Sequence, residues 1–174
     1  KSGFAGVEIS SGHGHIFHQF LSSWSNNRLD EYGGSLKNRT RILIELINGI
    51  RSECGKNFII GIRLPGNDFI KGSIDLIESS KITLELASQK IVDFFCWVQG
   101  GHHRSLEMHL PDMHFPRGTY LDITKSLKSK TGGIPVAAVG KILEPVQAET
   151  LIADGTAVLV MLGRTLVTDA AWGL

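Results

Sequence analysis

Two glycine–base pairs, Gly140-Lys141 and Gly163-Arg164, are the residues of this sequence best suited to binding an anion. Each pair comes at or directly after the end of a short apolar run. Glycine at the end of a strand lets backbone N–H groups approach an anion closely. A neighbouring base adds a charge-assisted hydrogen bond, which is bidentate for arginine. One such pair alone indicates an ordinary turn, but two pairs at matching positions predict a phosphate site.

Histidines follow two other apolar runs, in residues 10–15 (SSGHGH) and 99–103 (QGGHH). Histidine can hold or donate a proton near neutral pH. The adjacent His102 and His103 would point apart in a strand or loop, and no carboxylate or third histidine is spaced to complete a metal site. We therefore predict no metal here. Substrate-pocket lining and a merely exposed loop both remain open for this segment.

Short apolar runs alternate with amphipathic stretches along the whole chain. The runs are nearly continuous and rich in Val, Ile and Phe, which is typical of parallel strands covered on both faces. We expect helices between them, starting at an N-cap such as Ser35 or at Pro145 and ending at glycines. The expected strands are residues 6–9, 58–64, 92–98, 134–139 and 157–162, and the expected helices are residues 36–54, 75–90, 120–130 and 145–154.

The repeated strand–helix order predicts an α/β fold with a parallel sheet. A doubly wound open sheet and an eight-fold barrel compete. The first strand–helix turn, residues 10–14, lacks the Gly-x-Gly-x-x-Gly spacing of a dinucleotide fold. A barrel places its phosphate site after its last two strands, where the two glycine–base pairs occur. The barrel is therefore favoured.

The bulk composition is that of an ordinary globular domain, with 174 residues, 42% of them apolar and a net charge of +1. No basic stripe indicates nucleic-acid binding, and no apolar run is long enough to span a bilayer. No signal peptide is visible. Cys54 and Cys96 indicate buried free thiols in a reducing compartment. We therefore expect a cytoplasmic protein with a small-molecule substrate and neither a nucleic-acid nor a membrane partner.

Residues 27–39 (NRLDEYGGSLKNR) closely resemble a signature of the old yellow enzyme family of FMN-dependent oxidoreductases. Residues 6–9, Gly14 and residues 18–21, 62–64, 134–142 and 153–155 also resemble that family, as does Gly163-Arg164. The likeness runs in unbroken order along nearly the whole chain. It implies a partial (β/α)8 TIM barrel, strands four to eight with their helices, so that residues 1–174 form a single incomplete FMN-binding domain.

The resemblance implies an NADH:flavin oxidoreductase of ene-reductase type, in which hydride passes from NAD(P)H through FMN to an activated alkene or related acceptor. Gly140, Lys141, Gly163 and Arg164 would hold the phosphate. Arg63 would lie beside the pyrimidine edge of the flavin and stabilise the anionic reduced ring. An ion pair of Arg63 with Glu8 is the alternative, and both can hold together, since an interior charge needs a partner.

The loop after the first strand departs from the family pattern. Where the family has two substrate-binding side chains and a proton-donating tyrosine, this sequence has Ser10, His13 and His15. By the resemblance His13 would bind the acceptor, Ser10 would be a weaker donor, and His15 would be a candidate proton donor. His18 is expected to be a packing residue. Arg28, Asp30 and Arg39 are expected to brace the long loop rather than to react.

A second hypothesis is not enzymatic. Five strands cannot close an eight-stranded barrel, so residues 7–9 and 157–162 would be exposed edges that pair with other chains. The chain would then be a truncated, catalytically inactive barrel fragment. It would form a homo-oligomer or join a missing N-terminal half of the barrel.

Overall fold

The computed structural model describes residues 3–102 and 104–173, and it contains one sheet of five parallel strands. The strands lie in the sheet in chain order, so each pairs with the next along the sequence. This arrangement confirms the expected α/β fold with a parallel sheet. The strands are β1 (Gly6–Ser10), β2 (Ile59–Asn67), β3 (Phe94–Gln99), β4 (Val136–Ala138) and β5 (Leu159–Val160).

All four expected helices are present, within a few residues of their expected ends. They are α2 (Leu36–Cys54), α3 (Leu76–Ser88), α5 (Leu121–Lys128) and α6 (Pro145–Ala153). Three further helices were not expected, because four to six residues are too few to show an amphipathic period. These are α1 (Ile16–Leu21), α4 (Leu106–His109) and α7 (Arg164–Thr168).

The ends of α2 show why the sequence begins and ends a helix where it does. The hydroxyl of Ser35 accepts a hydrogen bond from the backbone N–H of Asn38, as an N-cap does. At the other end Gly55 adopts a φ of 86°, in the left-handed region that glycine tolerates best. Between these ends Leu43 and Ile47 are fully buried on one face.

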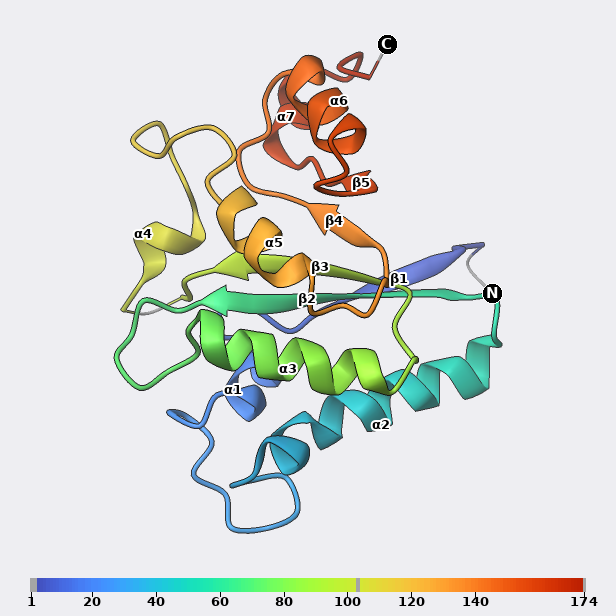
Figure 1. The fold of residues 1–174 in the computed structure, drawn as a ribbon, viewed down its shortest axis with the longest axis vertical. Helices are drawn as coiled ribbons and strands as arrows, with labels where there is room; N and C mark the ends of the chain where they lie inside the picture. The colour runs from blue at the N-terminus through green and yellow to red at the C-terminus, as the bar shows by residue number, and fades with distance from the viewer. Residues whose placement is uncertain (1–2, 103, 174) are drawn as a thin grey trace.

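The core lies between the sheet and the helices α2 and α3, which lie along one face of β1–β3 in Figure 1. Phe95 and Trp97 point to the same face of β3 and stack with ring centroids 5.9 Å apart. The Trp97 indole N–H donates to Thr83 Oγ1 on α3 at 3.2 Å. Burial of both faces of β2 and β3 explains why their sequences are continuous apolar runs rather than alternating ones.

The sheet curls but does not close, so it is a half-barrel with β1 and β5 at its two edges (Figure 1). Val7 on β1 and Leu159 on β5 are 40% and 45% exposed. The expectation of two exposed strand edges is therefore confirmed. Parallel strands of one sheet end at the same edge, so the loops after β1–β5 all lie on that side and can form one site.

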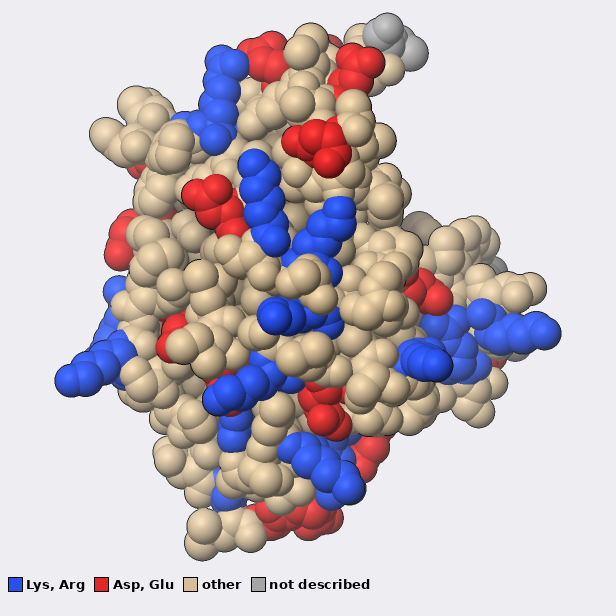
Figure 2. Space-filling model, in the orientation of Figure 1, with Lys and Arg blue, Asp and Glu red and all other residues tan. Residues whose placement is uncertain are grey.

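One expectation about the cysteines is wrong. Cys96 is buried in β3, but Cys54 is exposed, because it is the last residue of α2 and lies beyond the part of the helix that packs on the sheet. In the described part of the chain, no helix is long and apolar enough to cross a membrane. Figure 2 shows basic and acidic side chains interspersed on the face of Figure 1.

Candidate functional site

A cavity of about 1030 Å³ opens beyond the C-terminal ends of the strands. Six of the residues predicted above to form a site line this cavity. Its wall includes His13, Arg63, Gly140, Lys141, Gly163 and Arg164, with His109, Tyr120 and Met161. The structure thus brings the two glycine–base pairs, the arginine of β2 and one loop histidine to a single hollow.

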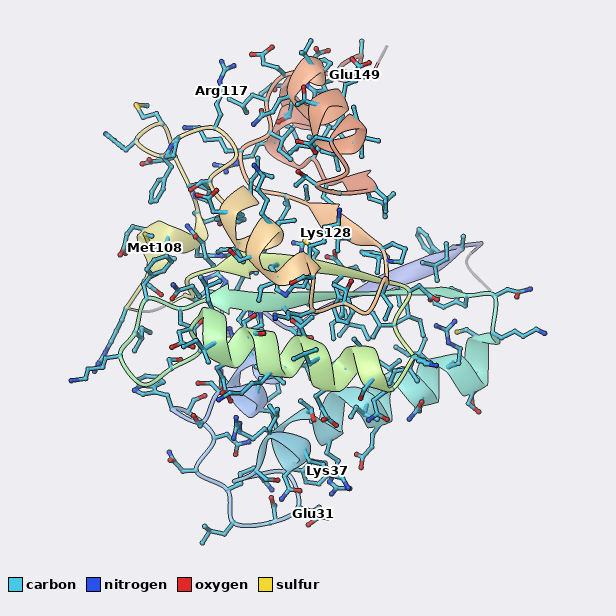
Figure 3. The ribbon with its side chains drawn as sticks, in the orientation of Figure 1. Glu31, Lys37, Met108, Arg117, Lys128 and Glu149 are labelled. Atoms are coloured by element: carbon cyan, nitrogen blue, oxygen red, sulfur yellow. The ribbon has the colours of Figure 1, made fainter. Side chains whose placement is uncertain are left out.

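Lys141 and Arg164 converge on one segment, residues 111–115. The Lys141 ammonium donates to the carbonyl of Asp112 at 2.7 Å and also to the carbonyl of Phe115. Arg164 Nη2 donates to the carbonyl of Pro111 at 2.9 Å. The segment lies between Met108 and Arg117, both labelled in Figure 3. The two bases, which come from consecutive strand ends, therefore face the same side of the molecule.

The two bases have no direct carboxylate partner in the described chain, although Asp112, Glu144 and Asp169 line the same cavity. Among the described residues, neither Lys141 nor Arg164 forms an ion pair with a carboxylate; their partners are neutral carbonyl oxygens. Two cations without a direct carboxylate partner beside one cavity favour an anion there. An anion would form stronger, charge-assisted hydrogen bonds with these donors than the neutral carbonyls do.

The two glycines differ in what they permit. Gly140 has a φ of 107°, and a Cβ there would lie 2.6 Å from the ring of Tyr120. Its missing side chain thus makes room for Tyr120, a reason that the sequence did not reveal. A Cβ on Gly163 would meet nothing within 4 Å. Within the described residues no contact requires glycine at that position, and the space that a Cβ would fill is open.

Arg63 forms the ion pair with Glu8 that the sequence suggested, with Nη2 2.6 Å from Oε1. The pair is only partly satisfied. Within the described chain, Arg63 Nε and Glu8 Oε2 are buried without a hydrogen-bond partner. Burial raises the pKa of Glu8, and the neighbouring Arg63 opposes that rise. Among the described residues, the pair thus leaves one N–H of Arg63 and one oxygen of Glu8 unsatisfied inside the protein.

Four histidines form a continuous cluster at the mouth of the half-barrel. The ring of His13 lies 3.9 Å from that of His109, His109 lies 4.5 Å from His102, and His102 lies 4.9 Å from His15. His13 and His15 lie in the loop after β1, His102 follows β3, and His109 is the last residue of α4. The segments are held together by a hydrogen bond from the His102 N–H to the His13 carbonyl.

Two of these histidines are kept neutral. Burial, followed by the charges of His109 and Arg63, lowers the pKa of His13 to about 3. Burial and the neighbouring His102 and His15 lower the pKa of His109. A neutral imidazole has one N–H donor and one acceptor nitrogen. At neutral pH the pair can therefore donate hydrogen bonds without adding charge to the site.

The backbone at two of the predicted site residues is strained. Outside glycine, four described residues have positive φ, and they include His13 at 64° and Lys141 at 55°. Such conformations cost about 1–2 kcal/mol for an ordinary residue, and they concentrate at functional sites. At His13 the strain is held by neighbours on α1, because the Gly14 N–H donates to His18 Nδ1 and the Gly14 carbonyl accepts from Gln19.

His18 is a packing residue, as expected. It is buried, and its Nε2 lies 3.0 Å from the buried carboxylate of Asp68. Because Nδ1 accepts from Gly14, the proton is on Nε2 and is donated to Asp68. The bracing role expected around the long loop is also confirmed. Arg28 donates to Asp30 at 3.0 Å, and Arg39 donates to the carbonyl of Leu21 at 2.8 Å.

Ser10 and His15 lie away from the cavity. Ser10 is the exposed last residue of β1, and His15 is an exposed residue whose ring contacts His13 and His102. Neither is part of the cavity wall. The substrate roles of Ser10, His13 and His15 all remain predictions, and of the three only His13 lines the cavity.

The sequence did not reveal His109 or Tyr120. The Tyr120 hydroxyl donates to the His109 carbonyl at 2.8 Å and to the Met108 carbonyl at 3.2 Å. Burial raises the pKa of Tyr120 to about 12, so the phenol keeps its proton. The sequence around Tyr120 shows only an apolar pattern, which predicts the start of a helix and says nothing of a functional role. The sequence around His109 gives no indication of its position, because its apolar residues show no helical or strand periodicity.

The histidine cluster does not have the geometry of a metal site. Within residues 3–102 and 104–173, no group of three or more His, Cys, Asp or Glu side chains is arranged to hold a metal ion. The metal interpretation of His102-His103 rested partly on His103, which lies outside the described residues. The third histidine that the sequence lacked near His102 is supplied in space by His109.

Comparisons with known proteins agree with this geometry. The model of the NADH:flavin oxidoreductase / NADH oxidase family matches residues 1–173. The chain is 34% identical to the NADH oxidase of Thermoanaerobacter brockii, over 97% of this chain and 26% of that protein. It is 32% identical to the cinnamate reductase of Clostridium sporogenes, over 98% of this chain and 27% of that protein.

Solved structures give the same result. The chain superimposes on 2-naphthoyl-CoA reductase in complex with 2-naphthoyl-CoA with a TM-score of 0.86 and 28% identity, over 98% of this chain and 26% of that one. It also shares the fold of morphinone reductase, with a TM-score of 0.72 at 23% identity. The chain thus spans about a quarter of the length of the first two curated relatives named above.

Proposed function

The chain belongs to the NADH:flavin oxidoreductase / NADH oxidase family, and from that premise we propose that it forms the phosphate-binding part of an FMN-dependent oxidoreductase. The complete enzyme would pass hydride from NAD(P)H through the flavin to an activated alkene or a related acceptor. The observation that carries the proposal is the convergence of Lys141 and Arg164, without a carboxylate partner, on one cavity wall.

The residues present fit a phosphorylated flavin. Lys141 and Arg164 supply two cationic donors for the phosphate, and the space beside Gly163 is open. Arg63, with an unpartnered buried Nε, supplies a fixed positive charge elsewhere on the same wall. A cavity of about 1030 Å³ can take a ligand larger than phosphate alone. When bound, the flavin would accept and release hydride.

The remaining work is done by side chains of this chain. Arg63, oriented by Glu8, would favour negative charge next to it, as a fixed cation in a partly dry site does. His13, held at the cavity wall by its strained backbone and kept neutral by burial, would donate a hydrogen bond to the acceptor. The charge stabilisation by Arg63 and the hydrogen bond from His13 both depend on the position of a side chain that does not itself react.

The test compares FMN with riboflavin, which lacks the phosphate. The purified chain would be titrated with each, and flavin fluorescence and visible absorption recorded. We expect FMN to bind with a Kd in the micromolar range and riboflavin to bind at least ten-fold more weakly. Riboflavin lacks the phosphate dianion and therefore cannot form two charge-assisted contacts worth about 1.5–3 kcal/mol each. Equal binding of the two, or no binding of FMN, would contradict the proposal.

A second candidate is favoured by one observation, the open edges of β1 and β5. In that case the chain would be an inactive barrel fragment that associates through these edges. Size-exclusion chromatography with light scattering separates the two. A flavin-bound monomer supports the enzymatic proposal, and a flavin-free oligomer supports the fragment.

A further inference from the structure

His18 is buried in α1, and its two ring nitrogens bond to two different loops at the mouth of the half-barrel. Its Nδ1 accepts a hydrogen bond from the backbone N–H of Gly14, in the loop after β1, at 2.9 Å. Its Nε2 lies 3.0 Å from Oδ2 of Asp68, in the segment after β2. Burial of a polar ring is favourable only when its nitrogens are hydrogen-bonded, and here both are. The ring therefore connects the two loops.

The proton between His18 and Asp68 belongs to His18. The Ser73 hydroxyl and the Ile74 N–H both donate to the same oxygen of Asp68, the Ile74 N–H at 3.2 Å. The Asp68 N–H donates back to the Ile74 carbonyl at 2.8 Å, which closes this segment on itself. An oxygen that accepts from two other donors presents an acceptor to the imidazole, so Nε2 carries the proton. Nδ1 is then left as an acceptor for the loop after β1.

The hydrogen bond from Gly14 holds a strained turn. His13 and Gly14 are successive residues with positive φ, at 64° and 83°. A left-handed conformation at a residue other than glycine persists only where its surroundings enforce it. Both backbone polar groups of Gly14 are bonded to side chains of α1, the N–H to His18 and the carbonyl to Gln19 at 2.9 Å. These two bonds act on the residue next to His13 and so set the direction of the His13 side chain.

We propose that His18 is a positioning residue, which holds the Gly14 N–H through Nδ1 and thereby keeps the His13 ring at the cavity wall. Asp68 fixes the proton of His18 on Nε2, so the segment after β2 supports a side chain of the loop after β1. His13 lines the cavity, whereas His18 does not and acts only through the backbone. The inference rests on the proposed function for the task of His13, and on the contacts of His18 for its geometry.

Two amide substitutions separate the roles of the two ring nitrogens. His18→Asn places an amide oxygen near the position of Nδ1, so it keeps an acceptor for the Gly14 N–H and loses the bond to Asp68. His18→Gln is longer and places its amide near the position of Nε2, so it keeps a donor for Asp68 and leaves the Gly14 N–H without an acceptor. Each variant loses one buried hydrogen bond, so both should be less stable than the original chain. Only His18→Gln should release His13.

The charge of the His13 ring reports its position. Burial, followed by the charges of His109 and Arg63, lowers the pKa of His13 to about 3, so the ring is neutral at pH 5 while it stays at the cavity wall. In chains labelled with ¹⁵N-histidine and free of flavin, the original chain and His18→Asn should show a neutral His13 ring at pH 5. In His18→Gln the ring should be protonated at that pH, with a midpoint that moves toward the ordinary value of about 6.5. The imidazole signals that are missing in His13→Asn identify those of His13.

The matched control is Thr83→Val, on α3. The buried Thr83 hydroxyl accepts from the Trp97 indole N–H at 3.2 Å and donates to the Ser79 carbonyl at 2.8 Å. Its removal therefore breaks buried hydrogen bonds that involve neither loop, and it should leave His13 neutral at pH 5. A neutral His13 at pH 5 in His18→Gln, or a protonated one in His18→Asn or Thr83→Val, overturns the positioning role.

A measurement on the unsubstituted chain covers the case in which a variant does not fold. The hydrogen bond between the Gly14 amide and His18 Nδ1 should give a scalar coupling between their two ¹⁵N nuclei, and the His18 ring shifts should show the proton on Nε2. Absence of this coupling overturns the inference. No step of the test requires flavin, so a failure of FMN binding contradicts the proposed function and leaves the result on His18 unchanged.

Discussion

The hydroxyl of Tyr120 donates a hydrogen bond to the backbone carbonyl of His109 at 2.8 Å. This bond links the two parts of the site. On one side the Tyr120 ring fills the space next to Gly140, in the turn that carries Lys141. On the other side His109 contacts His13. One buried side chain therefore positions both the Gly140–Lys141 turn and the segment that brings His109 to His13.

Removal of that bond tests the link. Tyr120→Phe should lower the free energy of unfolding by about 1 kcal/mol, because one buried hydrogen bond is lost and a carbonyl loses its donor. Urea denaturation measures this effect. The control is Tyr32→Phe, whose hydroxyl donates to Glu45 at the surface and should change unfolding by less than about 0.5 kcal/mol.

Substitution of Lys141 or Arg164 should weaken the binding of FMN but not the binding of riboflavin. Lys141→Met and Arg164→Met should each raise the FMN Kd by ten-fold or more, since each removes one charge-assisted contact worth about 1.5–3 kcal/mol. Riboflavin binding should hardly change. Flavin fluorescence titration measures both ligands. Lys128→Met, a surface change on α5, is the matched control. An equal loss of riboflavin and FMN binding would show that the bases act on the fold and not on a phosphate.

Gly140 should be intolerant of a methyl group. Gly140→Ala places a Cβ 2.6 Å from the Tyr120 ring and forces alanine to a φ of 107°. We expect a loss of about 2–4 kcal/mol of unfolding free energy, from overpacking and backbone strain together. The reference is Gly49→Ala in the middle of α2, where a Cβ meets nothing within 4 Å. That change should stabilise the chain by about 0.5–1 kcal/mol. Equal effects of the two substitutions would contradict the Tyr120 contact.

The neutral state of His13 predicts how stability depends on pH. Its folded-state pKa of about 3 lies below the value of about 6.5 expected in the unfolded chain. Between these values the unfolded chain binds more protons, so stability rises with pH in that window. The contribution is fully present above about pH 6.5 and is lost as the pH falls toward 3.

His13→Asn isolates this contribution, because asparagine tolerates the positive φ at this position. The free energy of unfolding from urea melts between pH 7.5 and 4.5 should fall less steeply in the variant than in the original chain. Subtraction of the two curves removes the contribution of all other groups. Parallel curves would show that His13 is not held neutral by the fold.

The sequence alone determined the framework of this protein. Continuous apolar runs and amphipathic stretches gave five strands and four helices close to their observed positions, because these patterns record burial on both faces of a sheet or on one face of a helix. The order of the elements gave the parallel sheet. The glycine–base pairs after the last two strands predicted that Lys141 and Arg164 lie at one cavity, because the ends of parallel strands meet at one edge of the sheet.

Only the tertiary structure decided how the site is completed. The segment that carries His109 has no periodic pattern, and its course is set by contacts with distant residues, namely Tyr120, Lys141 and Arg164. His13 and His109 are 96 positions apart in the printed sequence and meet because β1 and β3 end at the same edge. Local sequence records which residues are buried in an element. It does not record which side chain will hydrogen-bond to a loop carbonyl far along the chain, because that choice depends on packing in three dimensions.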